Sequence, residues 1–250
     1  MQVAMPQHAP IRVSSTDWFK ILGIAAFLID HAGLFFFPDD DVWRVFGRVA
    51  APIFFFFLGF AHSRSFPVSW LVWGVLLTGM EWWIEGDLTL NILLNFLFIR
   101  VALRAVDRIA QTPFRLGVVA AVSLACLPFV DAIFEYGAEG WLWALFGYAQ
   151  RAWRDERLAF ASARYFFAFL AAFTYALVEI GHHGFEGIDA AILALLIAIL
   201  TWSLLGFQRT ISVFQPPSFL ALPIKRAAQY SLEIYAVSLF LMQDLAYVFQ

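Results

Sequence analysis

His31 and the adjacent carboxylate of Asp30 are the residues whose type and position point most directly to chemistry. Both lie near the middle of residues 19–37, an apolar stretch long enough to cross a bilayer, whose only other charge is Lys20 at its start. His31 follows Lys20 by 11 residues, which places it roughly 16 Å further along a helix. Ionisable groups at such a depth are costly and usually mark function. A neutral imidazole there can accept a proton from a nucleophile and return it, as acyl transfer requires.

Arg48 is the leading candidate for a partner of Asp30. The side chains of Asp30 and His31 point about 100° apart on a helix, so a residue of another helix suits the carboxylate better. Arg44 and Arg48 share a helical face, where two guanidinium groups can bind an anion or stabilise an oxyanion. For Arg44 alone we favour a position at the outer interface, paired with residues 39–41. The alternative is that Asp30 and Arg48 only neutralise each other, while His31 bonds a backbone carbonyl.

Two further features of the sequence concern polar contacts inside the bundle. Pro52 lies four residues after Arg48 and is expected to bend this helix and free a carbonyl for a polar partner. Asn91 and Asn95 form an amide face that is directed into the bundle. They either join helices or contact a substrate or cofactor.

The segment 179–186 contains carboxylates and imidazoles at spacings that suggest a metal site. Two glycines interrupt its helix, and no second Glu-x-x-His helix completes a site. We therefore favour a polar loop that contacts an acceptor, and expect no metal. The residues in question are Glu179, His182, His183 and Glu186.

The composition is that of a protein whose main solvent is lipid. The chain is 62% hydrophobic and 14% charged, with a mean hydropathy of +0.76. We predict an all-α, polytopic transmembrane helix bundle. About nine spans are expected, near residues 19–37, 45–62, 67–85, 89–106, 114–134, 140–150, 163–181, 188–206 and 228–249. The span 140–150 is too short alone and is either half-buried or extended to residues 136–151.

Charged residues support this count independently. With a cytoplasmic N-terminus, all basic residues except Arg44 and Arg48 fall on the cytoplasmic side, and the opposite connections are acidic. The chain is expected to form a short polar tail over residues 1–15 and a single transmembrane domain over residues 16–250. The proline-containing connection 208–223 is expected to be irregular or to lie on the surface.

Two stretches of sequence resemble the TraX family. The first is Lys-Ile-Leu-Gly-Ile-Ala-Ala-Phe-Leu-Ile-Asp-His-Ala-Gly-Leu-Phe-Phe-Phe-Pro over residues 20–38, followed by Trp-Arg-Val-Phe-Gly-Arg-Val-Ala-Ala-Pro-Ile-Phe over residues 43–54. The resemblance is fairly specific over residues 18–64 and continues loosely through residues 90–94. Residues 231–239 look like the final helix of this family and of the wider group that includes heparan-glucosaminide acetyltransferase. There the motif commonly ends in His, where this chain has Ser238.

The resemblance implies a membrane N-acetyltransferase of the kind that modifies a pilin N-terminus. An acetyl group would pass from cytoplasmic acetyl-CoA to an acceptor reached from the membrane or the outer face. His31 would be the base or a transient acyl carrier, Asp30 would orient it or balance its charge, and Arg48 would stabilise the oxyanion or a carbonyl. The expected location is the bacterial inner membrane.

Sidedness, rather than any family motif, suggests which residues bind the phosphates of CoA. Guanidinium groups match phosphate bidentately. The candidates on the cytoplasmic side are Arg100, Arg104, Arg151, Arg154 and Arg157.

Three interpretations of function therefore remain. The first is an integral membrane acyltransferase acting on an amine or hydroxyl of a peptide or glycan, with membrane lipid and acyl-CoA as its other partners and no nucleic acid. The second is a proton-coupled transporter in which Asp30, His31 and Arg48 form a proton relay. The third is a non-enzymatic membrane assembly subunit.

Overall fold

The computed structural model describes residues 12–86, 88–212 and 214–249, and every regular element in these ranges is a helix. The expected tail over residues 1–15 lies largely outside the described residues. The helices are α1 (Ser15–Phe36), α2 (Asp41–Gly47), α3 (Ala50–Phe60), α4 (Val68–Glu85), α5 (Ile92–Ile109), α6 (Pro113–Ala125), α7 (Leu127–Asp131), α8 (Gly137–Arg154), α9 (Phe160–His183), α10 (Gly187–Leu205), α11 (Ser218–Gln229) and α12 (Ser231–Phe249).

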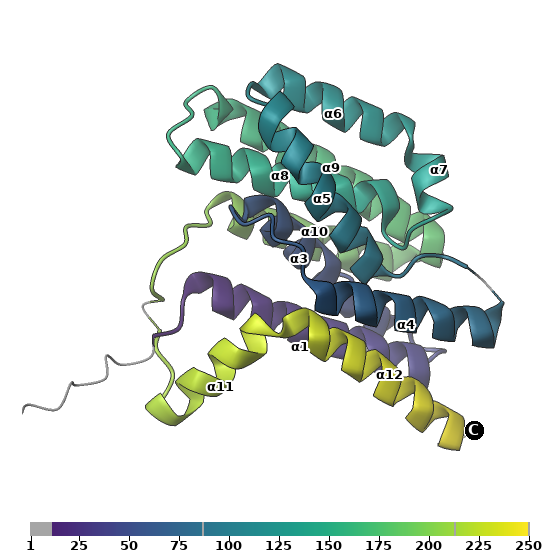
Figure 1. The fold of residues 1–250 in the computed structure, drawn as a ribbon. Helices are drawn as coiled ribbons and strands as arrows, with labels where there is room; N and C mark the ends of the chain where they lie inside the picture. Colours follow the sequence, from purple (N-terminus) through teal and green to yellow (C-terminus); the bar gives the residue numbers. More distant parts are fainter. Residues whose placement is uncertain (1–11, 87, 213, 250) are drawn as a thin grey trace, which may run out of the picture.

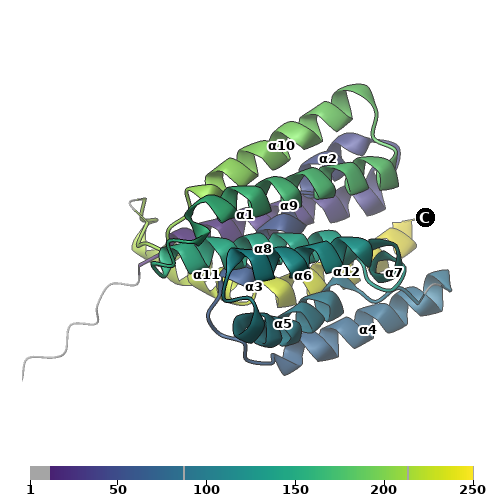
Figure 2. The same cartoon turned by 90° about the horizontal axis from the view of Figure 1, so that it is seen from above.

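Helices α3 and α8 form the centre of the bundle, and the other helices surround them (Figures 1 and 2). Residues 50–59 of α3 are all buried, as are residues 137–140 and 142–152 of α8. The two helices approach closely because glycines face the partner backbone. A Cβ at Gly59 would overlap the carbonyl oxygen of Ala144, and one at Gly147 would overlap that of Phe56. Any larger residue at these two positions would force the central helices apart.

The outer helices expose apolar side chains, as expected for surfaces that face lipid. Trp83 of α4, Phe169 of α9 and Trp202 of α10 are exposed by 84%, 64% and 77%. By length and hydropathy, four segments of the described chain are suited to cross a membrane: α1, the α2–α3 unit, α9 and α10. The all-helical membrane bundle is thus supported, while the count of nine spans is not.

Several expected spans are divided or extended. The span 140–150 is extended, because α8 runs from Gly137 to Arg154. The span 228–249 corresponds to α12, which begins at Ser231, shortly after α11 ends at Gln229. Helix α11 packs on α1, α12 packs on both α1 and α4, and the chain changes direction between the two helices (Figure 1). The irregular connection is also shorter than expected, since Pro223 lies inside α11.

Connections that carry basic residues meet at one end of the bundle. His62 contacts Asp155, Ser15 bonds the carbonyl groups of Gln208 and Thr210, and Arg154 bonds that of Phe207. At the other end, Leu90 pairs with the segment 133–135. We call these the basic end and the opposite end.

Candidate active site

The candidate catalytic residues gather around a cavity of about 480 Å³ near the opposite end of the bundle. Asp30 and His31 reach it from α1, Arg44 from α2, and Arg48 from the turn after α2. We call it the histidine cavity. Carboxylates predominate among the other polar groups on its wall, which include Glu81, Asp131, Glu135, Glu139 and Glu179.

Two guanidinium groups hold the carboxylate of Asp30. Nη2 of Arg48 donates to both carboxylate oxygens at 2.7 Å, and Nε donates to Oδ1 at 3.0 Å. Nη1 of Arg44 donates to Oδ2 at 3.0 Å. The expected Asp30–Arg48 pair is confirmed, but the outward position of Arg44 is wrong. Gly47 explains why, since a Cβ there would overlap Asp30; its absence lets α2 lie against α1 and brings Arg44 within reach.

The expected bend near Pro52 is present as a break between α2 and α3 at residues 48 and 49. Proline has no N–H, so the carbonyl of Arg48, four residues earlier, receives no helical hydrogen bond from it. The hydroxyl of Tyr175 on α9 donates to that carbonyl at 2.7 Å. The break therefore frees a carbonyl for a polar partner and also fixes the backbone that carries Arg48.

Arg48 also connects the site to α8 and α9. Its Nη1 donates to the hydroxyl of Tyr136 at 2.8 Å and lies 3.4 Å from Oε2 of Glu179. The same oxygen of Glu179 lies 3.2 Å from Nε2 of His183. A buried charge is tolerated only when it is paired and hydrogen-bonded, and Arg48 meets this condition through three helices.

Asn95 and Asn91 hold the backbone beside the cavity instead of lining it. Tyr136 has a positive φ of 54°, which is strained for a residue other than glycine. The side-chain amide of Asn95 donates to the carbonyl groups of Glu135 and Tyr136 at 2.9 and 2.8 Å. Asn91 caps α5 by accepting from the N–H of Leu93 at 2.9 Å. Neither amide is on the cavity wall, so the joining role describes them better than substrate contact.

His31 contacts a side chain of α12, not a backbone carbonyl. Its Nδ1 lies 3.2 Å from Oγ of Ser238, and its ring packs against Tyr235 and Phe27 with centroid distances of 5.1 and 5.7 Å. Because both oxygens of Asp30 are bonded to arginines, Asp30 balances the charge of those arginines, and Ser238 is the polar partner of the imidazole.

A second cavity, of about 630 Å³, opens at the basic end, and we call it the basic cavity. Its cationic wall residues are Lys20, Arg100, Arg154 and Arg209. Among the residues that the structure describes, the two cavities share the apolar wall residues Phe54, Phe96 and Leu232 and no others. His31 and Lys20 lie on the same helix, one at each cavity.

Comparison with known proteins gives a family assignment. The profile described as TraX protein matches residues 15–241, which is nearly the whole chain. The chain belongs to the TraX family. This family is associated with pilin acetylation. The uncharacterized protein RP591 of Rickettsia prowazekii (strain Madrid E) is 36% identical over 61 residues, which cover 24% of this chain and 25% of that protein. No solved structure matches the chain.

In this TraX family member, only some of the five arginines proposed for CoA binding line the basic cavity. Arg100 and Arg154 lie on the wall of the basic cavity, whereas Arg104, Arg151 and Arg157 do not. Nε and Nη2 of Arg104 donate to the carbonyl of Arg64, and Nη1 of Arg157 lies 3.5 Å from the hydroxyl of Tyr148.

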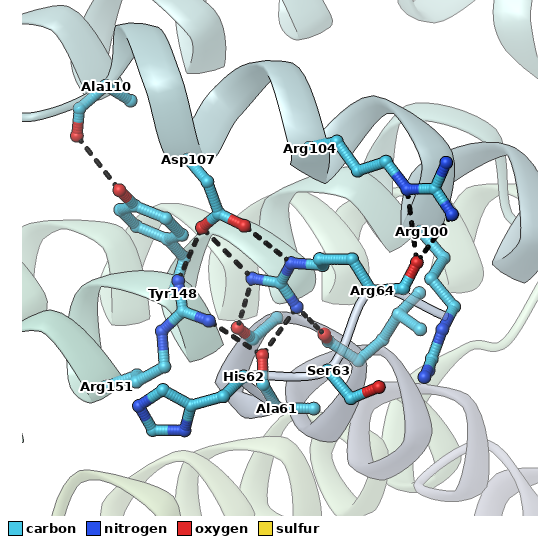
Figure 3. A network of polar contacts seen from close by, with 12 residues as sticks. Ala61, His62, Ser63, Arg64, Arg100, Arg104, Asp107, Ala110, Tyr148 and Arg151 are labelled. Carbon is cyan, nitrogen blue, oxygen red and sulfur yellow. Dashed lines mark hydrogen bonds and ion pairs between the residues drawn. The ribbon is translucent and has the colours of Figure 1, made fainter. Parts of the chain in front are cut away.

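Arg151 belongs instead to a polar network at the basic end (Figure 3). Arg151 and Arg64 both bond the carboxylate of Asp107, at 2.6 and 2.9 Å, and both bond the carbonyl of Ala61. Burial raises the pKa of Asp107, but the hydrogen bonds from the two arginines outweigh it, so this pKa is lowered from its ordinary value. The network ties the end of α3 to α5 and α8.

Side chains of the segment 179–186 contact one another and Arg48. Within the ranges that the structure describes, no group of three or more His, Cys, Asp or Glu side chains is arranged to hold a metal. Glu179 binds Arg48 and His183, and His182 and His183 face the histidine cavity.

Sequence reasoning missed several residues that the fold brings to Arg48 or to the walls of the two cavities. No sequence pattern indicates Tyr136 or Tyr175, because each contacts Arg48 from a part of the chain that is distant in sequence. The sequence could have indicated Lys20, because it lies on the same helix as His31, at the end that the charge distribution predicts to be cytoplasmic. Arg209 is a single basic residue in a connection, and nothing in the sequence distinguishes it.

Proposed function

We propose that this TraX family member is an inner-membrane acyltransferase that transfers an acetyl group from cytoplasmic acetyl-CoA to an amine or hydroxyl of a peptide or glycan. The observation that carries the proposal is the pair of cavities. One is rich in cationic side chains and lies at the basic end; the other contains His31, and three apolar residues contribute to both walls.

The basic cavity suits the donor substrate. Phosphate groups are bound by guanidinium and ammonium groups, and Lys20, Arg100 and Arg154 offer both kinds on one wall. Trp70 lies on the same wall beneath Arg100, whose guanidinium carbon is 5.1 Å from the ring centroid, and it gives an aromatic surface for an adenine base. Acetyl-CoA supplies the activated thioester carbonyl.

The histidine cavity suits the acceptor and the proton transfers. His31 takes the proton that the acceptor amine or hydroxyl loses as its bond to the acetyl carbon forms, and returns a proton to the sulfur as the carbon–sulfur bond breaks. Arg44 lies on the same wall, uses Nη1 for Asp30, and has further N–H groups to stabilise negative charge that develops on the carbonyl oxygen. The donors of Arg48 are engaged by Asp30, Tyr136 and Glu179, so Arg48 adds positive charge near the site and holds Asp30. The surrounding carboxylates favour an acceptor that carries positive charge or several hydrogen-bond donors.

Transfer is tested with purified protein in proteoliposomes, [1-¹⁴C]acetyl-CoA, and two acceptor probes, a short peptide with a free N-terminal amine and glucosamine. The wild-type protein is expected to acetylate at least one probe. The His31→Gln variant is expected to bind acetyl-CoA with unchanged affinity and to lose roughly 100-fold or more in transfer rate. Equal rates for the wild type and the variant, or no transfer by a wild-type protein that binds acetyl-CoA, would contradict the proposal.

A further inference from the structure

Ser238 contacts two hydrogen-bonding groups at once. Its Oγ lies 2.9 Å from the backbone carbonyl oxygen of Tyr235, one turn earlier in α12, and 3.2 Å from Nδ1 of His31 on α1. Ser238 is 9% exposed and His31 is 4% exposed, so water competes little for either contact. The contact with His31, which lines the histidine cavity, joins the helices α1 and α12.

The proton count at Ser238 determines the direction of both bonds. A serine hydroxyl has one proton to donate and two lone pairs that accept. The carbonyl of Tyr235 can only accept, so the single proton of Ser238 points toward it. Oγ then accepts from Nδ1, and this requires a proton on Nδ1 of His31. No other arrangement makes both short contacts hydrogen bonds.

The consequence concerns the other nitrogen of the ring. A neutral imidazole carries one proton, so a proton on Nδ1 leaves a lone pair on Nε2. Contacts with Tyr235 on one side and Phe27 on the other restrict rotation of the ring. The side chain of Asp30, the adjacent carboxylate, is engaged by Arg44 and Arg48 and does not serve as the orienting group.

We propose that Ser238 is a positioning residue that holds His31 in the Nδ1–H tautomer, so that the unprotonated Nε2 is the atom that receives the proton of the acceptor. The role of Nε2 as acceptor of that proton rests on the proposed function; the tautomer itself does not. Ser238 thus performs the orienting task that a carboxylate performs for histidine in many hydrolases.

The tautomer is tested directly by ¹⁵N NMR of protein labelled at histidine and reconstituted in lipid, at a pH where His31 is neutral. The His31→Gln variant identifies the His31 signals by their disappearance. The expected wild-type spectrum shows a protonated Nδ1 and an unprotonated Nε2. In Ser238→Ala a mixture of tautomers or the Nε2–H form is expected, whereas Ser238→Thr, which keeps the hydroxyl, is expected to retain the wild-type pattern.

Activity gives the second readout. Ser238→Ala is expected to lower kcat by about 10-fold to 100-fold, with KM for acetyl-CoA changed less than twofold, because the base and not the donor site is altered. Ser238→Thr is expected to recover most of kcat. A wild-type His31 with its proton on Nε2, or a Ser238→Ala variant with the wild-type tautomer, would overturn the proposal. Absence of acetyl transfer by a wild-type protein with the expected tautomer would instead count against the proposed function alone.

Discussion

The hydroxyl of Tyr175 donates at 2.7 Å to the backbone carbonyl of Arg48, which receives no helical hydrogen bond from Pro52. This bond fixes the turn between α2 and α3 from which the Arg48 side chain extends to Asp30. The position of the buried Asp30–Arg48 ion pair therefore depends on the break between α2 and α3 and on the Tyr175 hydroxyl of α9.

Replacing Tyr175 with Phe is expected to leave the carbonyl of Arg48 buried without a partner. Such a loss costs about 1–3 kcal/mol in the free energy of unfolding. We expect a lower midpoint of thermal unfolding in detergent for Tyr175→Phe. The control is Tyr230→Phe, because Tyr230 is 44% exposed. Equal midpoints for Tyr175→Phe and the wild type would show that this bond does not stabilise the fold.

Arg48→Met removes the cation shared by Asp30 and Glu179. Breaking a buried ion pair on one side costs about 3–5 kcal/mol, because the remaining charge is uncompensated. The variant is expected to express poorly or to unfold at a much lower temperature. The double variant Glu179→Gln/Arg48→Met is expected to recover part of this loss, because Asp30 keeps Arg44 as a partner and the second change removes the carboxylate that Arg48→Met leaves without a guanidinium group. A double variant less stable than Arg48→Met would refute the pairing as the cause.

Asp107 gives a dependence of stability on pH. Its pKa is lowered in the folded protein, so the ionised carboxylate stabilises the fold above its ordinary pKa of 3.8, and this contribution is lost as pH falls through the lower folded pKa. Asp107→Asn is expected to be less stable than the wild type at pH 7. The difference in unfolding midpoint is expected to shrink steadily below about pH 4. A difference independent of pH over this range would contradict the assigned network.

Asn95→Ala is expected to act through Tyr136. Without the two amide bonds, the strained backbone of Tyr136 relaxes, and its hydroxyl moves away from Arg48. We expect transfer activity to fall about 10-fold while KM for the acceptor stays within twofold, as measured by steady-state kinetics in proteoliposomes. A large rise in KM for the acceptor with unchanged kcat would instead indicate direct contact between Asn95 and the acceptor.

The sequence indicated the core of the candidate site because its members are ionisable residues in apolar surroundings. Asp30, His31 and Arg48 are costly to bury, and this cost makes them visible without a structure. The bend expected from Pro52 was also correct, because proline has no N–H to bond the carbonyl four residues earlier, whatever the rest of the fold. These features depend on local chemistry alone.

Features that depend on distant contacts were not predictable. Arg44 faces inward only because Gly47 allows α2 to lie close to α1, and hydropathy carries no information on that distance. The change of direction between α11 and α12 likewise accompanies the packing of α12 on α4 as well as on α1, which hydropathy does not indicate. The distribution of basic residues predicted that five arginines lie at one end of the bundle. Which of them line a cavity, Arg100 and Arg154, depends on helix packing.

The central claim is that the basic cavity binds the acetyl donor, and calorimetry of acetyl-CoA binding to the protein in lipid nanodiscs tests it most directly. The wild type is expected to show saturable binding, and Arg100→Ala/Arg154→Ala is expected to weaken it by about 10-fold or more, since each charge-assisted bond contributes about 1.5–3 kcal/mol. The matched control is Arg108→Ala/Arg115→Ala, because both arginines are exposed and neither lines the cavity. Retained wild-type affinity in this control would support the claim. No saturable binding by folded wild-type protein, or equal weakening in both double variants, would contradict it.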